Sequence, residues 1–213
     1  MKTKLLASVS VVMLSLARLM ASEATPSRAA LKPGEAKAKM EAAALEIATL
    51  RSNIVQTLVQ LDQVRNPQNR QANFQEFVRS LTSLEKQVQQ TAERAQAMKR
   101  NTGAYFAEWE ARTAEIQDPA KRRSAESRYT ARKRSYESIV TNLQEARRNF
   151  DPMLSSLKQI QIILENNPDP GQIAAAKDLF MRANWRCLDV QRSLMATEAE
   201  FTFLAADFAQ NEK

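Results

Sequence analysis

The chain has 213 residues, a formal net charge of +7, one cysteine, three glycines and no histidine. The missing histidine excludes His-based acid–base catalysis, catalytic triads with His and the Glu-x-x-His di-iron sites of helical bundles. The low glycine content, with much Ala, Glu, Gln, Lys, Arg and Leu, is typical of long helices.

Residues 1–24 have the pattern of a secretory signal peptide. Two lysines precede an apolar run over residues 5–17, which is too short to span a bilayer as a helix. Small residues suited to a signal peptidase stand at Ser22 and Ala24. We therefore predict an exported protein of the periplasm or cell envelope, with a retained signal anchor as the alternative. No cysteine follows this segment, which excludes lipid attachment there.

The rest of the chain predicts a linker at 25–34, a single helical domain at 35–210 and a tail at 211–213. Asn66-Pro67, Asp118-Pro119 and Asp169-Pro170 each place a capping side chain before a proline, the residue favoured at the first helical position. The prolines divide the domain into four predicted helices, at about 35–65, 67–117, 119–166 and 170–209.

Each predicted helix carries apolar residues at heptad spacing, such as Ile47, Leu50, Ile54 and Leu61 in the first. Short connections make neighbouring helices antiparallel. The expected fold is therefore all-α, an elongated antiparallel bundle or coiled coil of four helices. Asp151-Pro152 also resembles a helix start, but the heptad continues through it in phase, so we expect a kink there and no turn.

The most distinctive stretch is YFAEWEAR, residues 105–112. Folding the second predicted helix onto the third brings Tyr105 opposite Arg132. The same folding predicts a cluster of large rings, namely Tyr105, Phe106, Trp109, Tyr129, Tyr136, Phe201 and Phe208. We interpret the motif residues as structural, with a binding tip as the alternative. These motif residues are Tyr105, Phe106, Glu108, Trp109 and Glu110.

Positive charge is concentrated in the third predicted helix. Residues 119–148 have a net charge of +6, from nine Lys and Arg against Glu126, Glu137 and Glu145. One interpretation is a solvated face, and the other is contact with anionic lipid headgroups, lipopolysaccharide or wall polymer. The export signal argues against nucleic acid. The hypothesised anionic-surface residues are Arg132, Lys133, Arg134, Arg147 and Arg148.

Three further residues lie where an apolar side chain is usual or expected. Arg112 and Arg132 occupy heptad positions that are normally apolar. Each either extends its charged end to solvent or pairs with a nearby glutamate, or it is a buried cation that receives an anionic group. Cys187 lies on the apolar stripe of the fourth predicted helix, which predicts a buried, inert thiol.

Motifs that carry chemistry are missing from the sequence. No Gly-rich phosphate loop and no CxxC occurs, and Glu108 and Glu110 point to different sides of a helix. We therefore predict no enzymatic activity, no catalytic residue, no cofactor, no metal and no small-molecule substrate.

Several of these stretches follow one another in an order that resembles a known family. The order is Tyr105 to Arg112, an acidic-to-basic turn, Arg122 to Arg134 with Tyr136, and then Asp151 to Leu154. It is similar to an uncharacterised bacterial family of exported, coiled-coil-like proteins, classified as a domain of unknown function. The resemblance covers about residues 40–208, rests on the aromatic-x-Glu-Trp-Glu motif, and implies an all-helical exported protein without a known activity. Many family members look like lipoproteins, whereas this chain lacks the cysteine.

Together these patterns predict a non-enzymatic helical scaffold or binding protein of the bacterial cell envelope. The alternative is a periplasmic holdase-type chaperone for unfolded envelope proteins. The expected partner is an envelope protein or an anionic envelope polymer or lipid surface. An apolar stripe left over on the first or fourth helix is compatible with a monomer or a homodimer.

Overall fold

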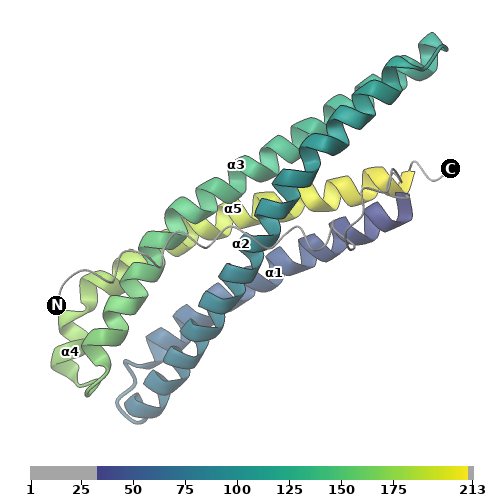
Figure 1. The fold of residues 1–213 in the computed structure, drawn as a ribbon. Coiled ribbons are helices and arrows are strands. Elements are labelled where there is room, and N and C mark those ends of the chain that lie inside the picture. The colour runs from purple at the N-terminus through teal and green to yellow at the C-terminus, as the bar shows by residue number, and fades with distance from the viewer. Residues whose placement is uncertain (1–32, 211–213) are drawn as a thin grey trace. The chain divides into compact units, whose positions relative to one another are not determined.

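The computed structural model describes residues 33–210 (Figure 1). The predicted signal peptide at 1–24, most of the linker at 25–34 and the tail at 211–213 lie outside the described residues. Over 33–210 the chain forms helices and no strand, which confirms the all-α class. The helices are α1 (Pro33–Gln63), α2 (Arg70–Ala114), α3 (Pro119–Leu164), α4 (Pro170–Ala175) and α5 (Lys177–Gln210).

Most helix starts follow the proline signals in the sequence. Three helices begin at Pro33, Pro119 and Pro170, where the missing N–H is not needed for a helical hydrogen bond. The side chain of Asp118 accepts the backbone N–H two residues later at 2.8 Å, and that of Asp169 accepts the one three residues later at 2.9 Å. These bonds satisfy donors that the first helical turn leaves free.

The second helix is shorter than predicted, because it begins at Arg70 and ends at Ala114. Local side-chain bonds hold the preceding residues in a turn. Asn66 accepts the backbone N–H two residues later at 3.1 Å, and Asn73 donates to the carbonyl of Gln63 at 2.8 Å. Such side-chain bonds to the backbone compete with helix formation, so the first turn after Pro67 is lost.

The predicted fourth helix is two helices, so the expected count of four is wrong for residues 33–210. The break lies at Ala176, whose φ of −84° and ψ of 0° depart from helical values. Its carbonyl accepts both Leu179 N at 2.9 Å and Phe180 N at 3.1 Å. Ala176 is fully buried and the apolar spacing continues across it, so the heptad pattern carries no sign of the break.

The third helix continues through Pro152, as the uninterrupted heptad predicts. Phe150 and Met153, on either side of the Asp151-Pro152 step, are both buried, so packing holds the helix together there. Proline has no N–H to donate to the carbonyl one turn earlier, that of Arg148.

The packing divides into two compact units, each built from parts of α1, α2, α3 and α5. Within the described residues the first unit comprises 33–46, 88–140 and 198–210. The second unit comprises 47–87 and 141–197 and includes α4. The single domain over 35–210 stays a prediction.

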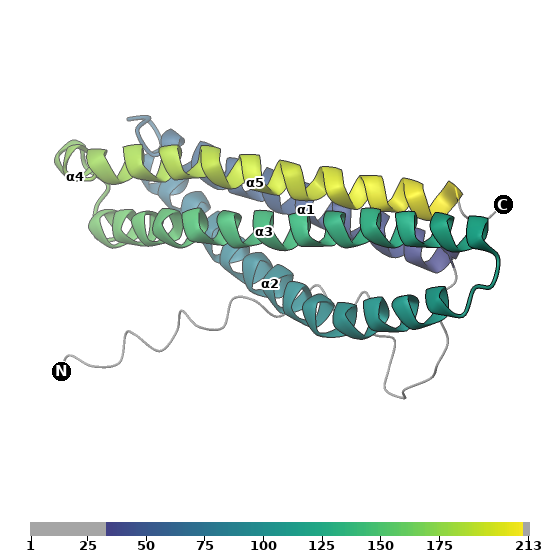
Figure 2. The ribbon, with the colours of Figure 1, turned by 90° about the horizontal axis from the view of Figure 1, so that it is seen from above.

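In the second unit, side-chain contacts define which helices are neighbours. As residue numbers rise along α1, the residues that they contact on α2 and on α5 have falling numbers. α1 is therefore antiparallel to each of these helices (Figures 1 and 2). The contact pairs are Gln63–Asn73 and Asn53–Gln87 for α1 with α2, and Arg51–Gln191 for α1 with α5. Arg65, in the turn just after α1, also contacts Phe180 of α5. α3 contacts α2 through Lys158 and Glu85.

The predicted heptad positions form the cores of both units. In the second unit, Ile47, Leu50, Ile54 and Leu61 of α1 are all buried, together with a set from the other helices. That set includes Phe74, Phe77, Leu81, Leu84, Met153, Leu157, Ile160, Phe180, Val190 and Leu194. The first unit has fewer large aliphatic residues in its core, where Met40, Met98, Ile139, Phe201 and Leu204 are buried.

Two phenylalanines on α5 test this division between core and surface. Phe201 is 0% exposed and Phe203 is 51% exposed. We expect Phe201→Ala to lower the free energy of unfolding by about 3–5 kcal/mol, and Phe203→Ala to change it by less than about 0.5 kcal/mol. Urea unfolding of the two variants measures the difference, and equal losses would contradict the packing of the first unit.

Candidate functional site

The YFAEWEAR segment lies in the first unit, where its rings pack against α3. Phe106 lies 5.6 Å from Tyr129 and 5.8 Å from Tyr136, measured between ring centroids. Trp109 lies 6.2 Å from Tyr129, and Tyr105 lies 5.6 Å from Trp109. The three aromatic residues of the segment are half-buried, so their rings form a cluster between two helices that still reaches water.

Burial affects the ionisation of two of these tyrosines. It raises the pKa of Tyr105, against the opposing effect of its hydrogen bond with Arg132. It also raises the pKa of Tyr136, against a hydrogen bond with Thr102. Both phenols therefore stay protonated and neutral at physiological pH, and they contribute packing and hydrogen bonds.

The two glutamates of the motif are exposed and form no joint site. Glu108 pairs with Arg112 one turn later on the same helix, at 2.5 Å. Glu110 points into solvent. Of the sequence interpretations of Arg112, pairing with a nearby glutamate is therefore the one observed.

Arg132 is buried at the centre of the aromatic cluster. Its Nε donates to Asp207 Oδ2 at 2.5 Å, and its Nη1 donates to the hydroxyl of Tyr105 at 3.4 Å. The guanidinium carbon also lies 3.9 Å from the ring centroid of Phe208 and 4.7 Å from that of Trp109. A planar cation can stack on rings while its N–H groups bind a carboxylate.

This geometry corrects one of the hypothesised anionic-surface residues. Arg132 does not face an envelope surface, because it is buried and ion-paired with Asp207 of its own chain. The sequence pairing of Tyr105 with Arg132 is confirmed, whereas the acidic partner on α5 was not anticipated. The apolar spacing of α5 does not predict that Asp207 pairs with a buried arginine.

The other four hypothesised residues differ in what they contact. Lys133 and Arg134 are exposed in the first unit, with Lys133 Nζ 5.6 Å from the ring centroid of Tyr129. In the second unit, Arg147 is half-buried and lies 3.5 Å from Asp151, while Arg148 is exposed. Whether any of these residues binds an anionic surface stays a prediction.

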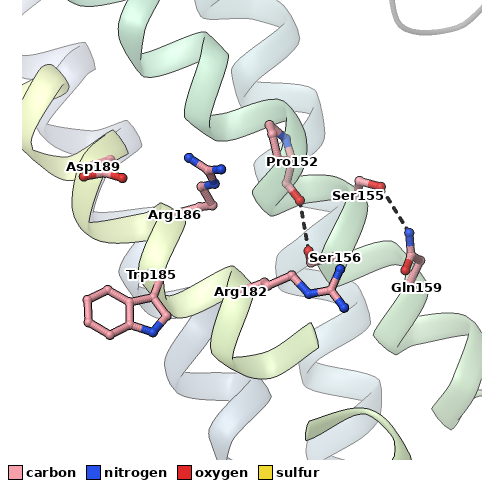
Figure 3. Close-up of a pocket in the computed structure, with 8 residues that line it drawn as sticks. All are labelled: Pro152, Ser155, Ser156, Gln159, Arg182, Trp185, Arg186 and Asp189. Atoms are coloured by element: carbon pink, nitrogen blue, oxygen red, sulfur yellow. Dashed lines mark hydrogen bonds between the residues drawn. The ribbon is translucent and has the colours of Figure 1, made fainter. Parts of the chain in front are cut away.

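A groove of about 450 Å³ lies between α3 and α5 in the second unit (Figure 3). Short side chains on α3 leave this space open, and longer charged side chains of α5 border it. The α3 side is lined by Pro152, Ser155, Ser156 and Gln159, and the α5 side by Arg182, Trp185, Arg186 and Asp189. The spacing of three and four residues places each set on one helical face.

Polar contacts order both walls of the groove. Gln159 Nε2 donates to Ser155 Oγ at 3.4 Å, and Ser156 Oγ donates to the carbonyl of Pro152 at 3.0 Å (Figure 3). Arg186 Nη1 donates to the amide oxygen of Asn149 at 2.9 Å. Arg186 on α5 therefore contacts α3 through a neutral side chain, and this contact does not neutralise its positive charge.

The groove has an excess of positive charge. Asp189 is the one carboxylate in its lining, and it lies 3.4 Å from Arg192. Among residues 33–210, neither Arg182 nor Arg186 forms an ion pair. Arg148 stands one turn before Pro152 on the α3 face that includes Ser155, so it extends the basic character along that helix.

The sequence interpretation missed this groove. Its local signal was present, because arginines four residues apart on α5 stand opposite a run of proline and serines on α3. These residues could not be predicted to face each other, because the register between α3 and α5 depends on tertiary packing.

Residues 33–210 also lack two features that mark other functional classes. No helix of 33–210 is long and apolar enough to cross a membrane. Over the same residues no group of three or more Cys, Asp and Glu side chains is placed to hold a metal ion. Cys187 is buried, and burial raises the pKa of its thiol, which disfavours the reactive thiolate.

The buried Arg132–Asp207 pair generates a test of the first unit. We expect Asp207→Ala to lower the free energy of unfolding by about 2–3 kcal/mol, because it leaves a buried cation without its partner. Adding Arg132→Met to that variant should cost less than the sum of the two single changes, since no unpaired charge remains.

The matched control for this test is Glu108→Ala, which removes an exposed ion pair with Arg112. It should change stability by less than about 0.5 kcal/mol. Additive losses in the double variant, measured by urea unfolding, would show that Arg132 and Asp207 are not energetically coupled.

Comparison with known proteins connects the chain to one family. A family model described as "Protein of unknown function (DUF2959)" matches residues 37–200. The matched region includes the aromatic segment, Arg132 and both walls of the groove, and it ends before Asp207. No curated protein and no solved structure matches the chain. The protein therefore belongs to the DUF2959 family of proteins of unknown function.

Proposed function

We propose that this protein is a non-enzymatic binding protein and helical scaffold of the bacterial cell envelope. Its groove between α3 and α5 takes an anionic segment of an envelope polymer. The observation that carries this proposal is the pair Arg182 and Arg186, which border one groove and form no ion pair among residues 33–210.

The chemistry of the groove suits phosphate or carboxylate groups on a polyhydroxyl chain. A guanidinium group presents several N–H donors in one plane, which match two oxygens of a phosphate or carboxylate at once. Ser155 and Gln159 add a hydroxyl and an amide that can exchange hydrogen bonds with sugar hydroxyls. The open form of the groove suits an extended chain better than a small enclosed molecule.

The envelope is proposed because of the predicted signal peptide at 1–24. An exported protein meets lipopolysaccharide, wall polymer and anionic lipid headgroups, all of which carry phosphate or carboxylate groups. Exposed positive charge also attracts such polymers from a distance, through the field of the whole surface. Lys133, Arg134 and Arg148 contribute to that field.

Binding of purified lipopolysaccharide to the protein tests the proposal. We expect binding at low salt that weakens towards physiological salt, where screening limits charge interactions to about 8–10 Å. Arg182→Gln with Arg186→Gln should weaken it more than about tenfold, or 1.4 kcal/mol. The measurement is a titration followed by calorimetry or by the fluorescence of Trp185.

The matched control is Lys133→Gln with Arg134→Gln, which removes the same charge from the first unit. It should weaken binding by less than half as much on a logarithmic scale. If this control lost binding and the groove variant kept it, the site would lie on the basic segment of α3. Absence of binding to lipopolysaccharide, wall polymer and anionic vesicles at low salt would reject the anionic partner.

A holdase-type chaperone for unfolded envelope proteins is the second candidate. It is favoured by exposed apolar side chains in the second unit, notably Trp185 and Leu188 on α5. Unfolded chains bind to such surfaces through the hydrophobic effect. A pull-down from envelope extract separates the two candidates, because a holdase retains many unfolded clients whereas the groove retains one class of polymer.

We also propose that the long helices form an antiparallel bundle of the coiled-coil type. The support is the heptad spacing of their buried residues and the neighbours observed within the second unit. Cysteines introduced at Asn66 and Pro168 in a Cys187→Ser background should crosslink within one chain, because the turns after α1 and α3 meet at one end. Failure of a short crosslinker to join them would reject this arrangement.

A further inference from the structure

A second apolar stripe runs along α5, separate from the one buried in the core. It consists of Met181, Trp185, Leu188 and Met195, all of them exposed. Trp185 is 70% exposed and Leu188 is 58% exposed. The spacing of four, three and seven residues is the heptad spacing of a helix that packs against another helix.

The facing part of α1 extends this stripe. Arg51 and Gln191 are joined by two hydrogen bonds, of 3.2 and 2.9 Å, which set α1 beside α5 at this level. Val55 and Val59 follow Arg51 by one and two turns and are exposed. Since α1 and α5 are antiparallel here, these valines lie at the level of Leu188 and the turn before it. We call the six residues Val55, Val59, Met181, Trp185, Leu188 and Met195 the outer face.

The outer face is large enough for a stable contact. Side chains of these types at this exposure leave on the order of 500 Å² of apolar surface in water. That is near the upper end for the largest patch on a monomeric protein. A standard interface buries about 800 Å² per partner, of which about 65% is apolar in homodimers. The outer face therefore supplies the apolar area that one homodimer contact needs.

One charged residue within the stripe selects the partner and its direction. Arg192 occupies the heptad position between Leu188 and Met195, and its side chain is exposed. In a parallel pair of α5 helices, Arg192 would face its own copy, and like charges repel. In an antiparallel pair centred on Leu188, Arg192 faces the ring of Trp185, which attracts a cation.

We infer that the outer face binds the outer face of a second copy of this chain, with the two α5 helices antiparallel about Leu188. In this pairing Met181 of each copy contacts Met195 of the other, because both lie seven residues from Leu188. Each Trp185 stacks with Arg192 of the second copy. The contact is isologous, as in most homodimers, so every pair except Leu188 with its own copy is formed twice.

The groove stays open in this dimer. The ring of Trp185 points away from Ser155 and Gln159, whereas Arg182 points towards them (Figure 3). The two surfaces share Trp185 at their boundary, and the other α5 residues of the groove, Arg182, Arg186 and Asp189, lie outside the outer face. The dimer does not depend on anion binding, so the two proposals can fail separately.

Sedimentation velocity tests the dimer, with protein that is purified from cells in the form in which the cells process it. The wild-type chain should sediment as a dimer at micromolar concentration, and Leu188→Glu as a monomer, with the dissociation constant raised more than about a hundredfold. The control is Ile162→Glu on α3, which places the same charge at a residue that is 68% exposed and outside the outer face. It should remain a dimer. Circular dichroism should show all three chains equally helical.

Cysteine crosslinking tests the antiparallel register in a Cys187→Ser background. Leu188→Cys should form a disulfide between two copies under mild oxidation, because the two-fold axis passes beside it. Met195→Cys should not crosslink with itself, since fourteen residues of helix separate its two copies by about 21 Å. A mixture of Met181→Cys and Met195→Cys chains should crosslink.

Three outcomes would overturn the proposed dimer contact, and a fourth would overturn its antiparallel register. One is a wild-type chain that remains monomeric up to high micromolar concentration, and another is a Leu188→Glu chain that still forms the dimer. The third is a monomer whose outer face binds reduced, unfolded protein in a manner abolished by Leu188→Glu, which would assign this face to client binding. Self-crosslinking of Met195→Cys would replace the antiparallel register with a parallel one.

Discussion

The structure depends on one constraint: each long helix must bury a narrow apolar stripe that repeats every three and four residues. Helices of this length gain most of their stability from packing such a stripe, because propensity alone contributes little per residue. The stripe of α1, with Ile47, Ile54 and Leu61, is buried along its length. The aromatic cluster, the groove and the outer face lie where such a stripe is interrupted, where a helix carries a second stripe, or where small residues leave space.

An interruption explains the aromatic segment. Arg132 stands at a position where the repeat demands an apolar residue, and burying a cation without a partner is costly. The fold offsets that cost with the carboxylate of Asp207 and with the rings of Trp109 and Phe208, which lie next to the guanidinium group. The conspicuous Tyr105 and Trp109 are thus best understood through the arginine that they surround. Their role in the folded chain is to accommodate a buried charge.

A second apolar stripe on α5 and a space between α3 and α5 account for the two surfaces that are proposed to bind partners. On α5 a second apolar stripe lies outside the core, and an apolar surface in water favours association. Between α3 and α5, serines and a proline leave space where larger residues would pack, and arginines border it. A helix can therefore carry a core stripe, an association stripe and a ligand wall together, because different residues of each turn face different directions.

The helical class, most helix starts and the buried stripes are predictable from the amino-acid sequence, because they depend on local bonds and on a period that the chain repeats. Pro119 and Pro170 with their capping aspartates predict a helix start from only two adjacent residues. Three features depend on tertiary packing and are not predictable from the sequence: the break at Ala176, the pairing of Arg132 with Asp207 and the groove beside Arg182. Each of these joins residues far apart in the chain or responds to packing from several sides. Heptad spacing fixes which side of a helix is buried, but it leaves open which residue of another helix lies opposite, and that register is set only when the helices pack.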